Sequence, residues 1–243
     1  MLITKNIKLA EVILQNYHLI PIISRFGIKF GFGDKTAEQV CLQYKINVDF
    51  FLEIVNAFND KNYLPYEKLK KIPLSFTVNY LLKSHHYYNK IKLPNIENLI
   101  KKMEWEAGNS EKNKNVLDKF FSQYLKEVKE HTTNEEKEIY PYVLELEKNF
   151  YDKTADIEFI KKIKNKSIRD YADTHDELNS ALLDLKNIII KYLPPAKNRE
   201  ITEQLLTEIF KLEADMKDHT KLEDNVVVPV AEMMENELKK RTE

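Results

Sequence analysis

The sequence predicts an all-α protein in which a bundle of four long helices follows a small helical domain. Only 4 of the 243 residues are glycine and 32% are charged, a composition typical of long helices. Apolar side chains recur at helical spacing through most of the chain. Histidines recur 45, 44 and 44 residues apart, at His86, His131, His175 and His219. One long helix and its connection occupy about that length, so the spacing predicts antiparallel helices that meet at one level.

Residues 1–60 are predicted to form a compact domain of short helices. Its first amphipathic stretch is interrupted by Pro21 and stops near Gly27, where a glycine-rich turn begins. Two more helices are expected to start after Thr36 and Asn47, because both side chains can accept a hydrogen bond from the first turn of a helix.

Residues 61–74 carry two prolines and several lysines and are the predicted linker. The bundle is expected to occupy residues 75–240. Its helices are expected at about residues 75–100, 112–149, 156–192 and 198–240. Apolar periodicity continues after Pro94, Pro141 and Pro229, so we expect these prolines to kink the helices rather than end them.

Two segments of matching pattern, HTTNEEKEIYP and HTKLEDNVVVP, predict a metal site in the bundle. Each places a glutamate four residues after a histidine, giving the pairs His131–Glu135 and His219–Glu223. Positions i and i+4 share one face of a helix, and apolar residues precede both histidines at the same offsets. A buried carboxylate is costly unless it is paired or bound to metal. Asp224 competes with Glu223, but it lies about 140° around the helix from the histidine instead of about 40°.

Six nitrogen and oxygen ligands are too many for one tetrahedral zinc and suit two first-row metals bridged by carboxylates. The ligands that the even spacing favours are His86, His131, Glu135, His175, His219 and Glu223. The pattern alone leaves one position open between His85 and His86. His85 has more apolar residues on its side of the helix, whereas the even spacing favours His86.

Composition argues against several classes of partner. A net charge of −1 and a pI of about 6.6 give no broad basic field for nucleic acid or an anionic membrane. No apolar run approaches the roughly 18 residues of a membrane span, and the N-terminus lacks the pattern of a signal peptide. The single cysteine, Cys41, lies on an apolar stripe and suits a reducing compartment. We therefore expect a soluble cytoplasmic protein, for which a homodimer is a possible assembly.

The segments HHYYNKIKLP, HTTNEEKEIYP, THDELNSAL and HTKLEDNVVVP resemble the four signatures of haemerythrin-like di-iron proteins. They are most similar to the ScdA-type iron-sulfur cluster repair family. The resemblance implies a haemerythrin-like up-down four-helix bundle holding two iron ions, with Glu135 and Glu223 as bridging ligands. In that family the second histidine of the HH pair is a ligand, and this favours His86.

The resemblance also implies a function: repair or protection of iron-sulfur clusters under oxidative or nitrosative stress. Nitric oxide or oxygen would be the small ligand, and iron-sulfur proteins the clients. Oxygen-carrying haemerythrins have a further histidine where this chain has Asn179, and this difference argues against an oxygen carrier. The repair family has a cysteine pair near the N-terminus where this chain has Gly31 and Phe32. The alternative function is therefore a di-iron module that senses oxygen or nitric oxide, or stores iron, without turnover.

Overall fold

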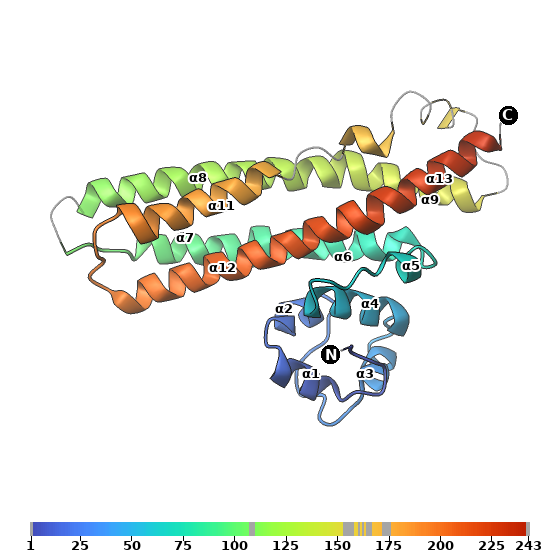
Figure 1. Cartoon of the computed structure of the whole chain (residues 1–243), viewed down its shortest axis with the longest axis horizontal. Coiled ribbons are helices and arrows are strands. Elements are labelled where there is room, and N and C mark those ends of the chain that lie inside the picture. The colour runs from blue at the N-terminus through green and yellow to red at the C-terminus, as the bar shows by residue number, and fades with distance from the viewer. Residues whose placement is uncertain are drawn as a thin grey trace. The chain divides into compact units, whose positions relative to one another are not determined.

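The computed structural model of the chain describes residues 2–106, 110–152, 158–159, 161, 163, 167–171 and 176–241. Regular structure in these residues is helical (Figure 1), and they contain no β-strand, which confirms the predicted all-α class. Pairing of the β type within them is limited to the isolated bridges Lys8–Thr36 and Trp105–Ala196.

Contacts divide the chain into two compact units. The first unit comprises Met1–Ser84, Tyr140–Tyr171 and Asp218–Glu243, and the second comprises His85–Ile139 and Ala172–Lys217. This division does not test the domain boundary predicted at residues 61–74, which stays a prediction. One helical turn, α5 (Tyr66–Leu69), lies within that segment.

Two of the N-terminal helices begin directly after the predicted capping residues Thr36 and Asn47. The helices of this region are α1 (Leu9–Gln15), α2 (Leu19–Ser24), α3 (Ala37–Gln43) and α4 (Val48–Asn59). Thr36 and Gln39 form a reciprocal capping box, and the Asn47 side chain accepts a hydrogen bond from the Phe50 amide at 2.9 Å. The predicted interruption at Pro21 is wrong. The break precedes α2, and Pro21 lies in the first turn of that helix, where its missing N–H needs no partner.

The long helices continue past their prolines as predicted, and π-helical turns accompany the prolines. The segments are α6 (Leu74–Tyr87), η1 (Tyr88–Lys92), α7 (Leu93–Lys101), α8 (Ser110–Asn134), η2 (Glu135–Ile139), α9 (Tyr140–Tyr151), α11 (Asp176–Asn187), η4 (Ile188–Tyr192), α12 (Arg199–Leu222), η5 (Glu223–Val227) and α13 (Val228–Lys240). The turns η1, η2 and η5 each end two residues before Pro94, Pro141 or Pro229. In η5 the Val228 amide donates to the carbonyl of Glu223, five residues back, so the chain accommodates the proline without ending the helix.

The third long helix differs from its prediction over residues 156–192. Ile168–Tyr171 forms a 3₁₀ helix, η3, so the described part is not one continuous α-helix. The Ile168 amide donates to the buried carboxylate of Glu235 at 2.8 Å, and the Tyr142 hydroxyl donates to the same oxygen at 2.5 Å. This side-chain acceptor takes the place of a helical carbonyl and favours a local turn. His175 lies outside the described residues.

The core of the second unit is apolar and aromatic, and α8 packs against α7 and α11 around it. At its margin, two lysines with little exposed surface are paired with glutamates: Lys92 with Glu208, and Lys186 with Glu213. Burial alone would raise the pKa of Glu208, but the hydrogen bond and charge of Lys92, with Lys211, lower it below the usual 4.5. The pKa of Glu213 is lowered in the same way, by Lys186 and Lys217.

These two pairs predict acid sensitivity of the metal-free protein. A carboxyl group whose pKa is lower in the folded state stabilises the protein above its unfolded pKa of 4.5, and this contribution is lost as the pH falls through the folded value. The free energy of unfolding, measured with urea, should therefore fall as the pH drops below 4.5. A Glu208→Gln/Glu213→Gln variant should lose less of its stability over the same range. An equal loss in both proteins would contradict this assignment.

Candidate metal centre

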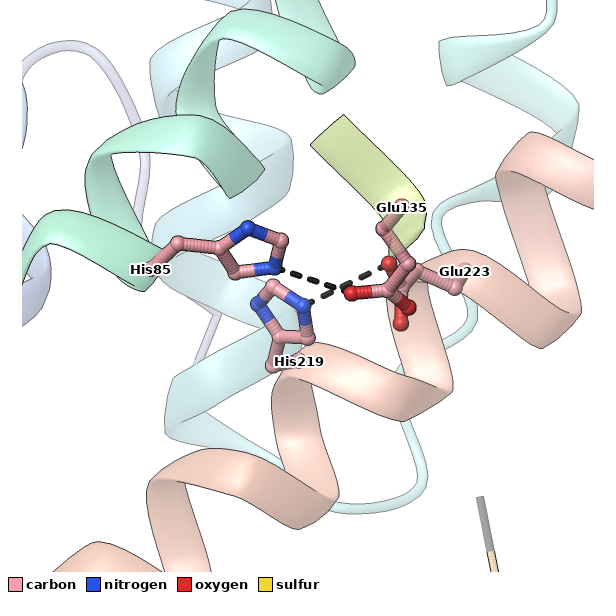
Figure 2. A group of neighbouring side chains, drawn as sticks. All are labelled: His85, Glu135, His219 and Glu223. Atoms are coloured by element: carbon pink, nitrogen blue, oxygen red, sulfur yellow. Dashed lines mark ion pairs between the residues drawn. The ribbon is translucent and has the colours of Figure 1, made fainter. Parts of the chain in front are cut away.

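Four buried side chains, His85, Glu135, His219 and Glu223, form one group (Figure 2). Each offers a ligand atom, and these atoms all lie within 4.8 Å of one another. They come from α6, η2, α12 and η5, so side chains far apart in the sequence converge on this point. Two imidazoles and two carboxylates without a thiol are a donor set suited to first-row transition metals. The residues present therefore fit a metal site.

Glu135 has a histidine at each of its two carboxylate oxygens. Its Oε2 lies 3.2 Å from Nε2 of His85, and its Oε1 lies 3.1 Å from Nε2 of His131. The carboxylate is buried and the His131 side chain is 13% exposed. Each oxygen of this carboxylate therefore faces a different imidazole.

Glu223 has a different set of neighbours. Its Oε1 lies 3.4 Å from Nε2 of His219 and accepts a hydrogen bond from the Tyr140 hydroxyl at 2.6 Å. Tyr140 is itself buried. One oxygen of this carboxylate thus faces both a histidine and a tyrosine hydroxyl, whereas the oxygens of Glu135 each face a histidine. The two carboxylates, equivalent in sequence pattern, are not equivalent in structure.

Helical periodicity could not have identified Tyr140. It follows His131 by nine residues, which in an ideal α-helix puts it about 180° away on the opposite face. The π turn η2 lies between the two residues and changes the register of everything that follows it. The visible signal of such a turn in the sequence was the proline ten residues after His131 and after His219.

Removing the Tyr140 hydroxyl should weaken the metal-free protein. The Tyr140→Phe variant keeps the ring and removes the hydroxyl that donates to the buried Glu223 carboxylate. We expect the free energy of unfolding to fall by about 1–3 kcal/mol, since a buried acceptor loses its donor. Urea denaturation measures this, with Tyr151→Phe at an exposed position as the matched control. Equal losses in the two variants would contradict the role assigned to the hydrogen bond.

The structure places His85, and not His86, in this group. The buried face of α6 runs through Val78 and Leu81 to His85 and continues to Tyr88, whereas His86 is exposed. Adjacent residues lie about 100° apart around a helix, so only one of two consecutive histidines can share that face. The expectation for His86 depended on even spacing and on resemblance. Neither of these distinguishes reliably between two adjacent histidines.

The other predicted residues divide as follows. Glu135, His219 and Glu223 lie in the group, and His131 contacts Glu135. Asp224, the competitor of Glu223, is exposed. His175 lies outside the described residues, so its place in the site stays a prediction. Sequence reasoning missed both Tyr140 and Glu136, whose Oε1 lies 3.0 Å from Nδ1 of His85.

The model of the hemerythrin HHE cation binding domain matches residues 78–231, more than half of the chain. The chain belongs to the haemerythrin family. The matched region of this haemerythrin-like protein contains both His-Glu pairs and His85, so the family and the geometry indicate the same metal-binding site. A comparison with curated proteins returns no significant match. Among the described helices, none is long and apolar enough to cross a membrane.

The N-terminal turn offers no pair of thiols. Gly31 has a φ of +98°, a conformation that side chains other than glycine rarely adopt, and Phe32 follows it. The single cysteine, Cys41, is fully buried, and burial raises the pKa of its thiol to about 12. Cys41 is therefore an inert core residue.

Proposed function

We propose that this haemerythrin-like protein holds a non-haem di-iron centre. The observation that supports it best is Glu135, whose two oxygens face His85 and His131 separately. The proposed ligands are His85, His131, Glu135, His175, His219 and Glu223. Of these, His175 rests on the sequence pattern alone. Two irons and six protein ligands would leave coordination positions open for a diatomic molecule such as oxygen or nitric oxide.

The protein's own contribution is the shape and polarity of the site. Burial of both carboxylates excludes water and strengthens their attraction for a cation. The imidazoles must be neutral to act as ligands, so acid should displace the metal. Bound iron would supply the redox chemistry, and the protein would supply its ligands and control which molecules reach it.

We infer that the centre serves to protect or repair iron-sulfur enzymes under oxidative or nitrosative stress. The support is the resemblance of the four histidine segments to the ScdA-type repair family. Two assays test this role. An iron-sulfur dehydratase damaged by nitric oxide should regain activity with the iron-loaded protein and not with a Glu135→Ala variant. Separately, reduction of nitric oxide to nitrous oxide should require the loaded protein and an added reductant. Failure of both assays with fully loaded protein would reject the role.

A second candidate is a module that binds oxygen or nitric oxide, or stores iron, without turnover. Gly31 and Phe32 stand in place of the repair family's cysteine pair, and Cys41 is buried, so transfer of iron through sulfur has no accessible thiol in this chain. Stoichiometric binding of nitric oxide by the reduced, iron-loaded protein, with no nitrous oxide formed, would favour this candidate. Continuous turnover would exclude it.

A further inference from the structure

The His85 ring has a carboxylate at each of its two nitrogens. Nε2 lies 3.2 Å from Oε2 of Glu135, and Nδ1 lies 3.0 Å from Oε1 of Glu136. The two glutamates are consecutive in η2, yet they differ in environment: the Glu135 side chain is 3% exposed and the Glu136 side chain 44% exposed. One of them belongs to the proposed ligand set and the other does not.

We propose that Glu136 is a positioning residue that holds the Nδ1–H of His85 and leaves Nε2 as the atom that binds metal. This inference rests on the proposed metal centre and extends it by one residue outside the ligand set. An imidazole that binds metal through one nitrogen carries its proton on the other, and an acceptor at that nitrogen fixes both the tautomer and the ring orientation.

The acceptor's exposure suits this role. Because the Glu136 side chain is 44% exposed, placing it beside His85 carries little of the desolvation cost of a buried charge. Glu136 also restricts rotation of the ring about its χ2 angle, so His85 keeps Nε2 directed toward Glu135 before metal arrives. Binding then costs less ordering of the side chain.

The two nitrogens are not interchangeable in this arrangement. Glu135 faces the other nitrogen, with its Oε2 3.2 Å from Nε2. A proton held on Nε2 by Glu135 would occupy the position that the metal requires. Glu136 therefore favours metal binding by keeping a proton on the far nitrogen.

The test compares three variants of the full chain. Glu136→Ala removes the acceptor. Glu136→Gln keeps an oxygen that accepts the Nδ1–H, and Glu138→Ala removes an exposed charge from the same π turn. Affinity for zinc is measured by competition with a chelator, beginning from metal-free protein whose helicity is unchanged. We expect Glu136→Ala to weaken binding by about 10–100-fold, the usual effect of removing an outer partner of a metal-bound histidine. Glu136→Gln and Glu138→Ala should stay close to the native affinity.

A spectroscopic measurement separates positioning from a general effect of charge. In the zinc-loaded protein, the Nδ1–H proton of His85 should be visible by NMR and protected from exchange. We expect it to persist in Glu136→Gln and Glu138→Ala and to disappear by exchange in Glu136→Ala. Native affinity and a protected proton in Glu136→Ala would overturn the inference. Failure of the native protein to bind zinc or iron would instead reject the proposed metal centre. The two outcomes are therefore distinguishable.

Discussion

Glu135→Ala is expected to leave the purified protein without bound metal. Both oxygens of this carboxylate face imidazole nitrogens, at 3.2 Å for His85 and 3.1 Å for His131. In the proposed centre Glu135 would bind both metal ions, so its substitution would remove one ligand from each ion. Metal analysis of protein from iron-replete cells, after desalting, measures the effect. Glu138→Ala, at an exposed position of the same turn, is the matched control and should retain metal like the native protein.

The corresponding change at Glu223 should be milder. The Tyr140 hydroxyl donates to one of its oxygens at 2.6 Å, and this hydrogen bond competes with metal for that oxygen. We expect Glu223→Ala to reduce metal content without abolishing it. Identical losses in Glu135→Ala and Glu223→Ala would show that the asymmetry seen in the side chains does not carry over to the loaded site. Native metal content in Glu135→Ala would contradict the bridging role.

The second large effect distinguishes two adjacent histidines. His85→Ala should weaken metal binding by more than the roughly 10–100-fold effect of losing an outer partner, since it removes a proposed ligand. His86→Ala should bind metal like the native protein, because its side chain is exposed. Chelator competition on both metal-free variants gives the comparison. A reversed result, with His86→Ala defective and His85→Ala normal, would restore the register implied by resemblance and reject the one seen in the structure.

Sequence patterns were sufficient to locate the two His-Glu pairs. A stripe of apolar residues carried each pair to the buried face of its helix, and the structure brings Glu135, His219 and Glu223 together with His85. Capping at Thr36 was predictable for a similar reason, because the capping box is formed by residues close in sequence. Both features depend on residues a few positions apart in the sequence, and sequence patterns predict such local arrangements well.

The parts that could not be predicted depend on departures from the ideal α-helix. The π turns before Pro94, Pro141 and Pro229 each rotate the residues that follow them relative to an ideal α-helix. The turn before Pro141 brings Tyr140 to the side of its helix that contacts Glu223. The 3₁₀ turn at Ile168–Tyr171 depends on a hydrogen bond to Glu235, which is 67 residues away and left no local signal. Contacts of that kind arise from tertiary packing, which a single sequence does not encode in its spacing.

The contact between Glu136 and His85 shows the same limit within one turn. HTTNEEKE contains two consecutive glutamates, and the four-residue spacing from His131 selects the first as a ligand. Nothing in the spacing indicates that the second glutamate reaches a histidine 51 residues earlier. The pairing becomes visible only when η2 and α6 are placed beside each other. Residues that orient ligands are, for this reason, harder to predict than the ligands.

The most direct test of the proposed centre is metal content together with the optical spectrum. Native protein from iron-replete cells is compared with a Glu135→Ala/Glu223→Ala double variant prepared in parallel. We expect about two irons per chain in the native protein, the content of carboxylate-bridged di-iron bundles, with near-ultraviolet absorption typical of an oxo-bridged pair. Both signals should be absent from the double variant. No bound metal in the native protein, or equal metal in both proteins, would contradict a di-iron centre at this site.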